Sequence, residues 1–510
     1  MVGRHGLNEM GAAGFWRAFG QGAKAAGEKG LFWGGACYGI LKREPMILKQ
    51  NGIWGEIMYE NVEYDQHFIG EFDVEGDLFN GELIFNKKNG GILIHLTKDV
   101  TIESAFRYHY GKVAVIIGKL NAGIVVTLFN NRCVKNHTNN FKLLTLNFVS
   151  DYFVWSDKER RDTLYNKMVS ILGNAYKWSG FSAFESVPGG VKIVDTLPQK
   201  TYNWFGVKIT FSPCLNNYIL LPFKEEETKI IQRLSVTIES SCKMPLDEFI
   251  KIRNRVTSLI SFAIKDNVNV DDEYLIDFDD SYTIGLKEAG YTEYSKHYLF
   301  TSSPILDTFS TYIHEYNFRM NQLPEDDTLN VKLDKLKPIF NLYLSLFKYP
   351  YMPHEMVFLN IAQALETFHA RFFYDDDKDQ FVKSVHQRFG SLPNFETYKK
   401  LLLSNAQKKS KHIILVSRLN DLFIGTNDGL FAEYYLKTNY AQKITDTRHY
   451  YTHYGEAREA ATLKGNDLLQ ATYILRLLLE YHVCLILGIN NTAKIAHSLQ
   501  AQSNSQKNCN

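Results

Sequence analysis

The apolar positions follow two different periods along the chain. Up to about residue 240, short β-branched and aromatic runs alternate with glycine and asparagine, a pattern typical of strands. The triplets Asn-Gly-Gly at 89–91 and Asn-Ala-Gly at 121–123 stand between such runs and predict two hairpins. Many short strands joined in this way predict a sandwich or an irregular barrel. Strands are expected at residues 82–85, 91–96, 112–117, 124–129, 143–148, 206–211 and 234–238.

From Pro245 onward the spacing of apolar residues becomes helical. Residues 245–265 predict a helix packed on the β-rich part, and Pro245 suits its first turn. Asn466 or Asp467 can cap the last long helix, and Gly488 can end it. Beyond residue 328, helices are expected at 329–347, 355–373, 379–389, 395–403, 430–438, 443–454 and 467–487.

The predicted fold class is therefore a multidomain α+β protein. A chain of 510 residues favours two or three domains. We expect a β-rich N-terminal domain with added helices at 46–325 and an all-α helical domain at 326–495. Residues 1–45 are expected to be a disordered leader or an upstream extension, because they are rich in glycine and alanine and lack a continuous apolar signal-peptide core. The polar residues 496–510 are expected to form a disordered tail.

Composition narrows the choice of partners and compartment. The formal net charge is only +1, so any basic site for a nucleic acid has to be local. The six cysteines are scattered without zinc-site spacing, which fits a reducing compartment, and we expect a cytoplasmic location. The most apolar stretch, 474–489, contains Arg476, Glu480 and His482. A buried amphipathic helix tolerates such residues at its rim, whereas a membrane span resists them, so no membrane partner is expected.

The residues best suited to chemistry gather on the short predicted helix 443–454. It carries Arg448, His449, His453 and three tyrosines, between the capping residues Thr445 and Asp446 and the helix-ending Gly455. A core helix would carry leucine or isoleucine there, and a surface helix would carry lysine and glutamate. A guanidinium that binds anionic oxygens and an imidazole that transfers protons together suit a phosphate ester.

Helical geometry separates these side chains. His449 and His453 are four residues apart and lie one above the other. Arg448 and His453 are five apart, so they point about 140° away from one another by the helical period. Two copies of the helix crossing at a two-fold interface would pool their residues, so the sequence favours a homodimer with a composite site.

Three alternatives accompany this interpretation. The helix could be an interface or surface helix without chemistry. The His449-x-x-x-His453 pair also has metal-ligand spacing, with Glu456 and His482 as the nearest further candidates, although a zinc hydrolase usually carries glutamate where Tyr450 stands. We expect no metal and no cofactor. Glu366, on the expected helix 355–373, either orients Arg448 through a charge-assisted hydrogen bond or forms a structural salt bridge.

The string Arg448-His449-Tyr-Tyr-Thr-His453 resembles the signature of HEPN-domain ribonucleases, which is Arg, then Asn, Asp or His, then three residues, then His. Its place on the penultimate helical segment, before a long apolar helix, also matches. The Ala364-Leu-Glu-Thr-Phe helix is similar to that of ApeA-type HEPN domains. Gly70-Glu-Phe, Gly81-Glu-Leu-Ile-Phe and Ile116-Ile-Gly resemble the β-rich N-terminal domain of ApeA-like anti-phage proteins. The HEPN resemblance covers about 330–490, and the N-terminal one about 55–320.

The resemblance implies a metal-independent endoribonuclease that usually acts as a dimer and defends against phage by abortive infection. The 2′-hydroxyl of the RNA substrate would attack the adjacent phosphorus and leave a 2′,3′-cyclic phosphate. His453 would act as general base or acid, Arg448 would stabilise the developing charge, and His449 would orient the site or contact the phosphate. Tyr450, Tyr451 and Tyr454 could stack on bases.

The resemblance also raises the question of control. The β-rich domain would hold the nuclease inactive until an unknown phage-derived or cellular trigger binds. The competing hypothesis is a non-catalytic HEPN module that only dimerises or binds RNA or a nucleotide.

Overall fold

The computed structural model describes residues 66–86, 91–101, 110–121, 123–139, 142–156, 164–188, 190–219, 228–276, 283–288, 316–325, 329–349, 351–426, 429–436 and 439–509. The leader expected at 1–45 lies outside the described residues, as do the first twenty residues of the expected β-rich domain.

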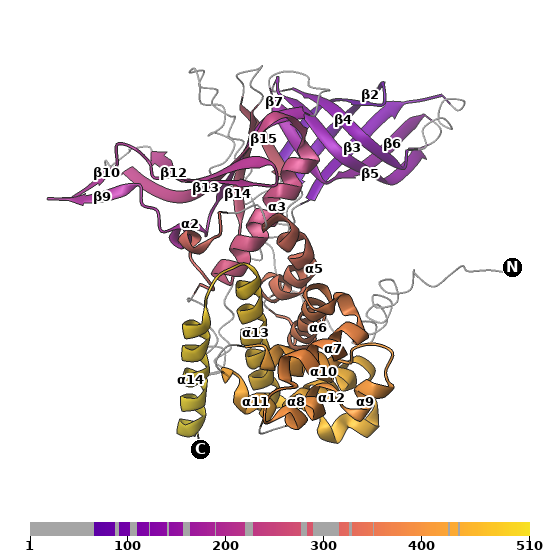
Figure 1. Cartoon of the computed structure of the whole chain (residues 1–510). Helices are drawn as coiled ribbons and strands as arrows, with labels where there is room; N and C mark the ends of the chain where they lie inside the picture. Colours follow the sequence, from indigo (N-terminus) through magenta and orange to yellow (C-terminus); the bar gives the residue numbers. More distant parts are fainter. Residues whose placement is uncertain are drawn as a thin grey trace, which may run out of the picture. The chain divides into compact units, whose positions relative to one another are not determined.

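Six antiparallel strands at the start of the described chain close into a barrel (Figure 1), because β5 pairs with both β4 and β6. Both predicted hairpins are present: Phe85 of β2 pairs with Ile92 of β3, and Lys119 of β4 pairs with Val125 of β5. The inward side chains, among them Phe72, form an apolar core of their own. The strands are β1 Gln66–Val74, β2 Asp77–Asn86, β3 Gly91–Asp99, β4 Lys112–Leu120, β5 Val125–Asn139 and β6 Leu143–Ser150.

The long strand β5 takes part both in the barrel and in the sheet layer that follows it. Its first part, up to Phe129, pairs with β7, and its second part, from Arg132, pairs with β6. Between them Asn130 takes a left-handed conformation (φ 55°), which asparagine tolerates better than most residues. The buried side-chain amide of Asn131 donates to the carbonyls of Val113 and Leu128, so it stabilises this bend.

From β7 the sheet continues as a separate layer in the order β7-β15-β14-β8-β13-β12-β11. The expected strands at 206–211 and 234–238 are confirmed as parts of β12 and β13. The bounds are β7 Tyr152–Ser156, β8 Leu164–Leu172, β11 Lys200–Trp204, β12 Val207–Ile219, β13 Thr228–Pro245, β14 Val270–Ile276 and β15 Thr283–Glu288; β9 Phe184–Val187 and β10 Gly190–Ile193 form a two-stranded sheet, and α2 spans Tyr176–Ser179.

Helix α3, Leu246–Ile264, packs its apolar side on strands β8 and β13. Pro245 stands at the N-cap, one position before the expected first turn. Its fixed φ suits this extended residue equally well, and the position needs no N–H donor. Lys265 ends the helix in a left-handed conformation (φ 57°). The expected helix on the β-rich part is therefore confirmed.

The residues described from 316 onward form helices and the loops between them, which confirms the predicted fold class of a β-rich region followed by a helical one. Helices α9, α10 and α14 were not predicted. Residues 496–509 form most of α14, on which Ile495 and Leu499 are buried, where the sequence predicted a disordered tail. The bounds are η1 Met320–Gln322, α5 Leu329–Lys348, α6 His354–Phe372, η2 Tyr374–Asp376, α7 Lys378–Phe389, α8 Phe395–Leu402, α9 Asn405–Lys409, α10 Leu415–Ile424, α11 Ala432–Leu436, α12 Tyr440–His453, η4 Glu456–Ala461, α13 Gly465–Ile486 and α14 Thr492–Cys509.

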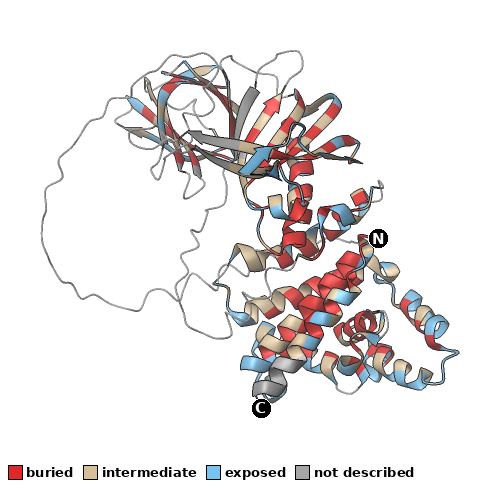
Figure 2. Ribbon diagram, turned by 90° about the vertical axis from the view of Figure 1, so that its left-hand side faces the viewer, coloured by how far each residue is buried: buried red, intermediate tan, exposed pale blue. Residues whose placement is uncertain are grey.

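Helix α13 is the core helix of the helical part and is buried over most of its length (Figure 2). By length and composition it is the one helix among the described residues that could cross a membrane, but 72% of its apolar window is buried inside the protein. Arg476, Glu480 and His482 are also buried, so their expected place at the rim of the helix is wrong. Each has polar partners instead: Glu480 forms an ion pair with Lys265, and His482 hydrogen-bonds the carbonyl of Leu422.

Candidate active site

The predicted chemistry-bearing helix is confirmed as α12, Tyr440–His453, with bounds that differ from those expected. Asn439 rather than Thr445 or Asp446 precedes it, and no side chain caps its first turn. Thr445 and Asp446 are inside the helix, where Thr445 donates back to the carbonyl of Ala441 and Asp446 pairs with Arg458. The helix ends at Tyr454, in a left-handed conformation with φ 50°.

Arg448 points from α12 to the neighbouring helix α6. Its Nη2 donates to the Oε1 of Gln363 and to the Oε2 of Glu366, both at 3.1 Å. The side chains of Arg448 and Glu366 are 30% and 28% exposed, so solvent still reaches the pair. This ion pair is the contact that both roles considered for Glu366 require, orientation of Arg448 and a structural salt bridge. Gln363 has no signal of its own in the sequence and was missed.

His449 and His453 form a pair at the surface of the same helix. Their ring centroids lie 4.7 Å apart in an edge-to-face arrangement, as the four-residue spacing predicts. Partial desolvation lowers the pKa of His449, and the positive charge of Arg458 lowers it further. A neutral imidazole on His449 is therefore favoured near pH 7, beside the exposed ring of His453.

The three tyrosines of the segment divide between the core and the surface. Tyr451 packs against the apolar core and its hydroxyl donates to the carbonyl of Leu463 at 3.2 Å, so it is a structural residue of the helix. Tyr454 is 66% exposed. The ring of Tyr450 is half-buried, with the Nζ of Lys464 5.8 Å from its centroid. Of the three expected to stack on bases, Tyr450 and Tyr454 have accessible rings.

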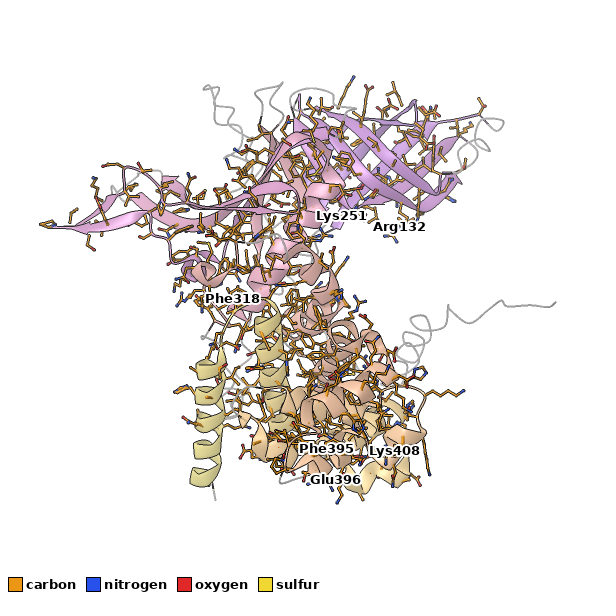
Figure 3. All side chains as sticks on the ribbon, in the orientation of Figure 1. Arg132, Lys251, Phe318, Phe395, Glu396 and Lys408 are labelled. Atoms are coloured by element: carbon orange, nitrogen blue, oxygen red, sulfur yellow. The ribbon has the colours of Figure 1, made fainter. Side chains whose placement is uncertain are left out.

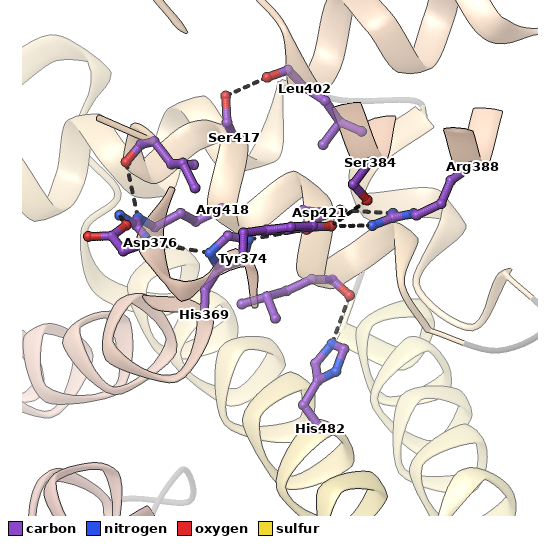
Figure 4. A network of polar contacts seen from close by, with 12 residues as sticks. His369, Tyr374, Asp376, Ser384, Arg388, Leu402, Ser417, Arg418, Asp421 and His482 are labelled. Atoms are coloured by element: carbon purple, nitrogen blue, oxygen red, sulfur yellow. Dashed lines mark hydrogen bonds and ion pairs between the residues drawn. The ribbon is translucent and has the colours of Figure 1, made fainter. Parts of the chain in front are cut away.

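A buried polar network, which sequence reasoning missed, lies one turn further along α6 (Figure 4). His369 is fully buried; its Nε2 donates to Asp421 on α10, while Arg418 donates to its Nδ1. Burial lowers the pKa of His369, which agrees with a neutral ring that accepts from Arg418. Arg388 of α7 and the hydroxyl of Tyr374 also bind the Asp421 carboxylate. The network ties α6, the helix that holds Arg448, to α7 and α10.

The metal-site alternative depends on a third ligand beside His449 and His453. His482 faces the Leu422 carbonyl in the core, at 2.8 Å, and does not join that pair. Among the residues that the structure describes, no three histidine, cysteine, aspartate or glutamate side chains are grouped so that they could hold a metal ion.

Comparison with known families covers most of the described chain. The sequence profile of the family ApeA N-terminal domain 1 matches residues 67–331, just over half of the chain, and that of Apea-like HEPN matches residues 359–493. The chain is an ApeA-like protein with a C-terminal HEPN domain. No curated protein and no solved structure matches it.

Both resemblances that the sequence suggested are thus confirmed as family relationships. Helix α12 and the Arg448 partners on α6 all lie within the HEPN match. Membership of the ApeA-like proteins indicates an anti-phage HEPN effector with a nuclease-like role. The barrel from its second residue onward and the whole layer from β7 to β11 lie within the N-terminal match.

Proposed function

We propose that this ApeA-like protein is a metal-independent endoribonuclease that acts in the cytoplasm as an effector of abortive infection. One observation carries the proposal. Arg448, His449 and His453 stand together on a surface helix of a HEPN domain, and Arg448 is held by Glu366 and Gln363. Such an arrangement provides a fixed cation for a phosphate and two imidazoles for proton transfer.

In the proposed reaction the 2′-oxygen of the substrate attacks the adjacent phosphorus. His453 accepts the 2′-hydroxyl proton as the new O–P bond forms, and the bond to the 5′-oxygen breaks. The leaving 5′-oxygen takes up a proton from water and His453 releases its proton to the solvent, so the products are a 2′,3′-cyclic phosphate and a 5′-hydroxyl. Arg448 stabilises the negative charge that develops on the phosphoryl oxygens, and His449 contacts the phosphate. A general base of this kind increases the reaction rate by about 10²–10⁴-fold.

The active enzyme in this proposal is a homodimer. Within one chain Arg448 turns to α6, whereas His453 is exposed five residues further along the helix. A two-fold axis beside α12 would bring the Arg448 of one protomer to the His453 of its partner. The N-terminal region would restrain this site until an unidentified trigger of phage or cellular origin binds.

The first experiment compares RNA cleavage by the wild type, Arg448→Ala and His453→Ala, with EDTA present and the trigger supplied by phage infection or phage lysate. Arg132→Ala and His137→Ala, exposed on the barrel strand β5, are matched controls. We expect the wild type and both controls to release 2′,3′-cyclic phosphate ends, and both α12 variants to be inactive. Intact RNA with the triggered wild type would favour the non-catalytic module, and cleavage that EDTA abolishes would favour a metal site.

A mixing experiment tests the composite site. When Arg448→Ala and His453→Ala protomers are combined, half of the dimers are heterodimers and each regains one complete site, so about a quarter of the wild-type rate is expected. A mixture as inactive as its components would contradict a site shared between protomers, because a site within one chain cannot be repaired by mixing.

A further inference from the structure

Positive charge is concentrated in one stretch of the HEPN domain. The 24 residues between Glu396 and Asp421 contain five lysines and one arginine and no carboxylate, a formal charge of +6, whereas the whole chain carries only +1. Arg418 is buried in the polar network. The other five form what we name the α8–α9 basic surface: Lys399, Lys400, Lys408, Lys409 and Lys411.

Four of these lysines have no carboxylate partner within the described part of the chain. Lys399 pairs with Glu396 at 3.0 Å and lies over the ring of Phe395. Among the residues that the structure describes, no carboxylate pairs with the four others, which are exposed: Lys400, Lys408, Lys409 and Lys411. In Figure 3, Phe395, Glu396 and Lys408 are labelled in the lower part of the helical region. Within the described structure, the surface therefore presents four ammonium groups that no carboxylate neutralises.

The backbone under the lysines is held in place by buried polar contacts. The fully buried side chain of Gln407 donates to the carbonyl of His412 and accepts from the amide of Ile414. Ser404 caps α9, and the Nζ of Lys378 donates to the carbonyls of Lys408 and Ser410. Because these contacts fix the backbone of residues 407–414, a ligand that binds the lysines does not have to offset the entropy cost of ordering it.

This surface shares a supporting helix with the candidate active site. Helix α10 packs against α8 on one side and against α12 on another, and Asp421 of α10 joins it to α6 through His369. A polymer bound along α8 and α9 would therefore contact the same small helical unit that carries Arg448.

We propose that the α8–α9 basic surface binds the phosphate backbone of the RNA substrate, outside the cleavage site and without reading its sequence. The inference rests on the proposed ribonuclease function and names how its substrate is held. Lysines act as point charges for phosphates. Protein–protein interfaces are depleted in lysine, so the composition of this surface favours a polyanion over an acidic protein partner.

The test measures binding separately from cleavage. The probe is a fluorescein-labelled single-stranded 2′-O-methyl RNA, which lacks the free hydroxyl needed for cutting, titrated with the full chain at several salt concentrations. The basic-surface variant carries Lys→Ala at 400, 408, 409 and 411. The control variant removes the same charge from exposed lysines of the N-terminal region, with Lys→Ala at 112, 135, 177 and 208.

We expect the basic-surface variant to bind the probe at least about tenfold more weakly and its log–log salt slope to fall by about 3, roughly 0.7 for each lost phosphate contact. The control variant should bind as the wild type does. Equal affinities and slopes for the basic-surface variant and the control would overturn the proposal. So would polyglutamate displacing the probe as well as unlabelled RNA of equal charge, because the surface would then serve acidic proteins.

The two proposals fail in different ways. If the wild type binds the probe through these lysines but never cuts RNA, the binding surface stands and the ribonuclease function falls. If RNA is cut and the basic-surface variant cuts with unchanged KM, the ribonuclease stands and the surface falls.

Discussion

The Nζ of Lys265, at the end of α3, lies 2.8 Å from the Oε2 of Glu480, in the middle of α13. The two side chains are 5% and 0% exposed. Tyr343 of α5 donates to the other oxygen of the same carboxylate at 2.6 Å. Because α3 packs on the β-sheet and α13 is the core of the HEPN domain, this ion pair joins the two regions that match the ApeA-like families.

Removing the lysine from this pair should destabilise the folded protein. Lys265→Met leaves the Glu480 carboxylate buried without its main partner, and we expect the free energy of unfolding to fall by about 3 kcal/mol or more. Urea denaturation measures it. Lys251→Met is the control, since Lys251 of the same helix is 61% exposed and, among the described residues, pairs with Glu248 alone. Equal losses for the two variants would show that the buried pair adds nothing.

Glu366 and Gln363 should affect catalysis more than stability. The Arg448–Glu366 pair is partly exposed, so Glu366→Gln should change the free energy of unfolding by less than about 1 kcal/mol. In the double variant Glu366→Leu/Gln363→Leu, Arg448 loses both of its side-chain acceptors on α6, and the cleavage rate should fall at least about tenfold. Initial rates are compared with those of Glu396→Gln on α8. An unchanged rate for the double variant would mean that Arg448 needs no positioning by α6.

Stability should decline in mild acid because of His482. Burial lowers the pKa of this imidazole to about 4, against 6.5 when it is exposed in the unfolded chain. The unfolded chain thus binds the proton first, so stability is complete above about pH 6.5 and falls by on the order of 3 kcal/mol towards pH 4. His482→Gln keeps a donor for the Leu422 carbonyl and removes the titration. Urea midpoints at pH 7.5 and 5 should therefore differ less in this variant, and an equal difference would contradict the assignment.

The pKa of His449 should respond to Arg458. Desolvation and the charge of Arg458 both lower it, whereas Asp446, the partner of Arg458, raises it. Arg458→Gln removes the cation and frees the Asp446 carboxylate, so the pKa of His449 should rise. Histidine-selective NMR titration follows it, with the resonance assigned by His449→Asn. Arg132→Gln, on the barrel, is the control, and a pKa that moves equally in both variants would exclude a local effect.

The sequence predicted the candidate helix α12 and most of the fold because both have local signals. Arginine, histidines and tyrosines on one short helix are visible in the residues alone, and so are hairpin turns and apolar periods. The partners of Arg448 were harder to predict, because Glu366 and Gln363 are more than 80 positions away in the sequence. In addition, a polar residue on an amphipathic helix has many possible roles.

Helix α10 was missed for a different reason. A binary pattern assumes that polar residues face water, but Ser417, Arg418, Asn420 and Asp421 are all buried in this helix. Their partners, such as His369 and the carbonyl of Leu402, come from other elements of the fold. The polar positions of α10 therefore do not mark a solvent-facing side, and the helical period is not visible in the sequence. The same error put Glu480 at the rim of α13, although Lys265 and Tyr343 satisfy it in the core.

Strand β5 pairs both with β6 of the barrel and with β7 of the next layer, and this limits where the chain can be truncated. A fragment ending after β6, near residue 150, keeps all six barrel strands but loses β7, which covers Val125–Phe129 of β5. Phe129 packs in the other apolar core, together with Val154 of β7, so the fragment would expose its ring beside the unpaired backbone edge of Val125–Phe129, and such an edge is a template for the addition of other strands. Although its six strands close into a barrel, a fragment consisting of the barrel alone would therefore aggregate through this exposed edge of β5.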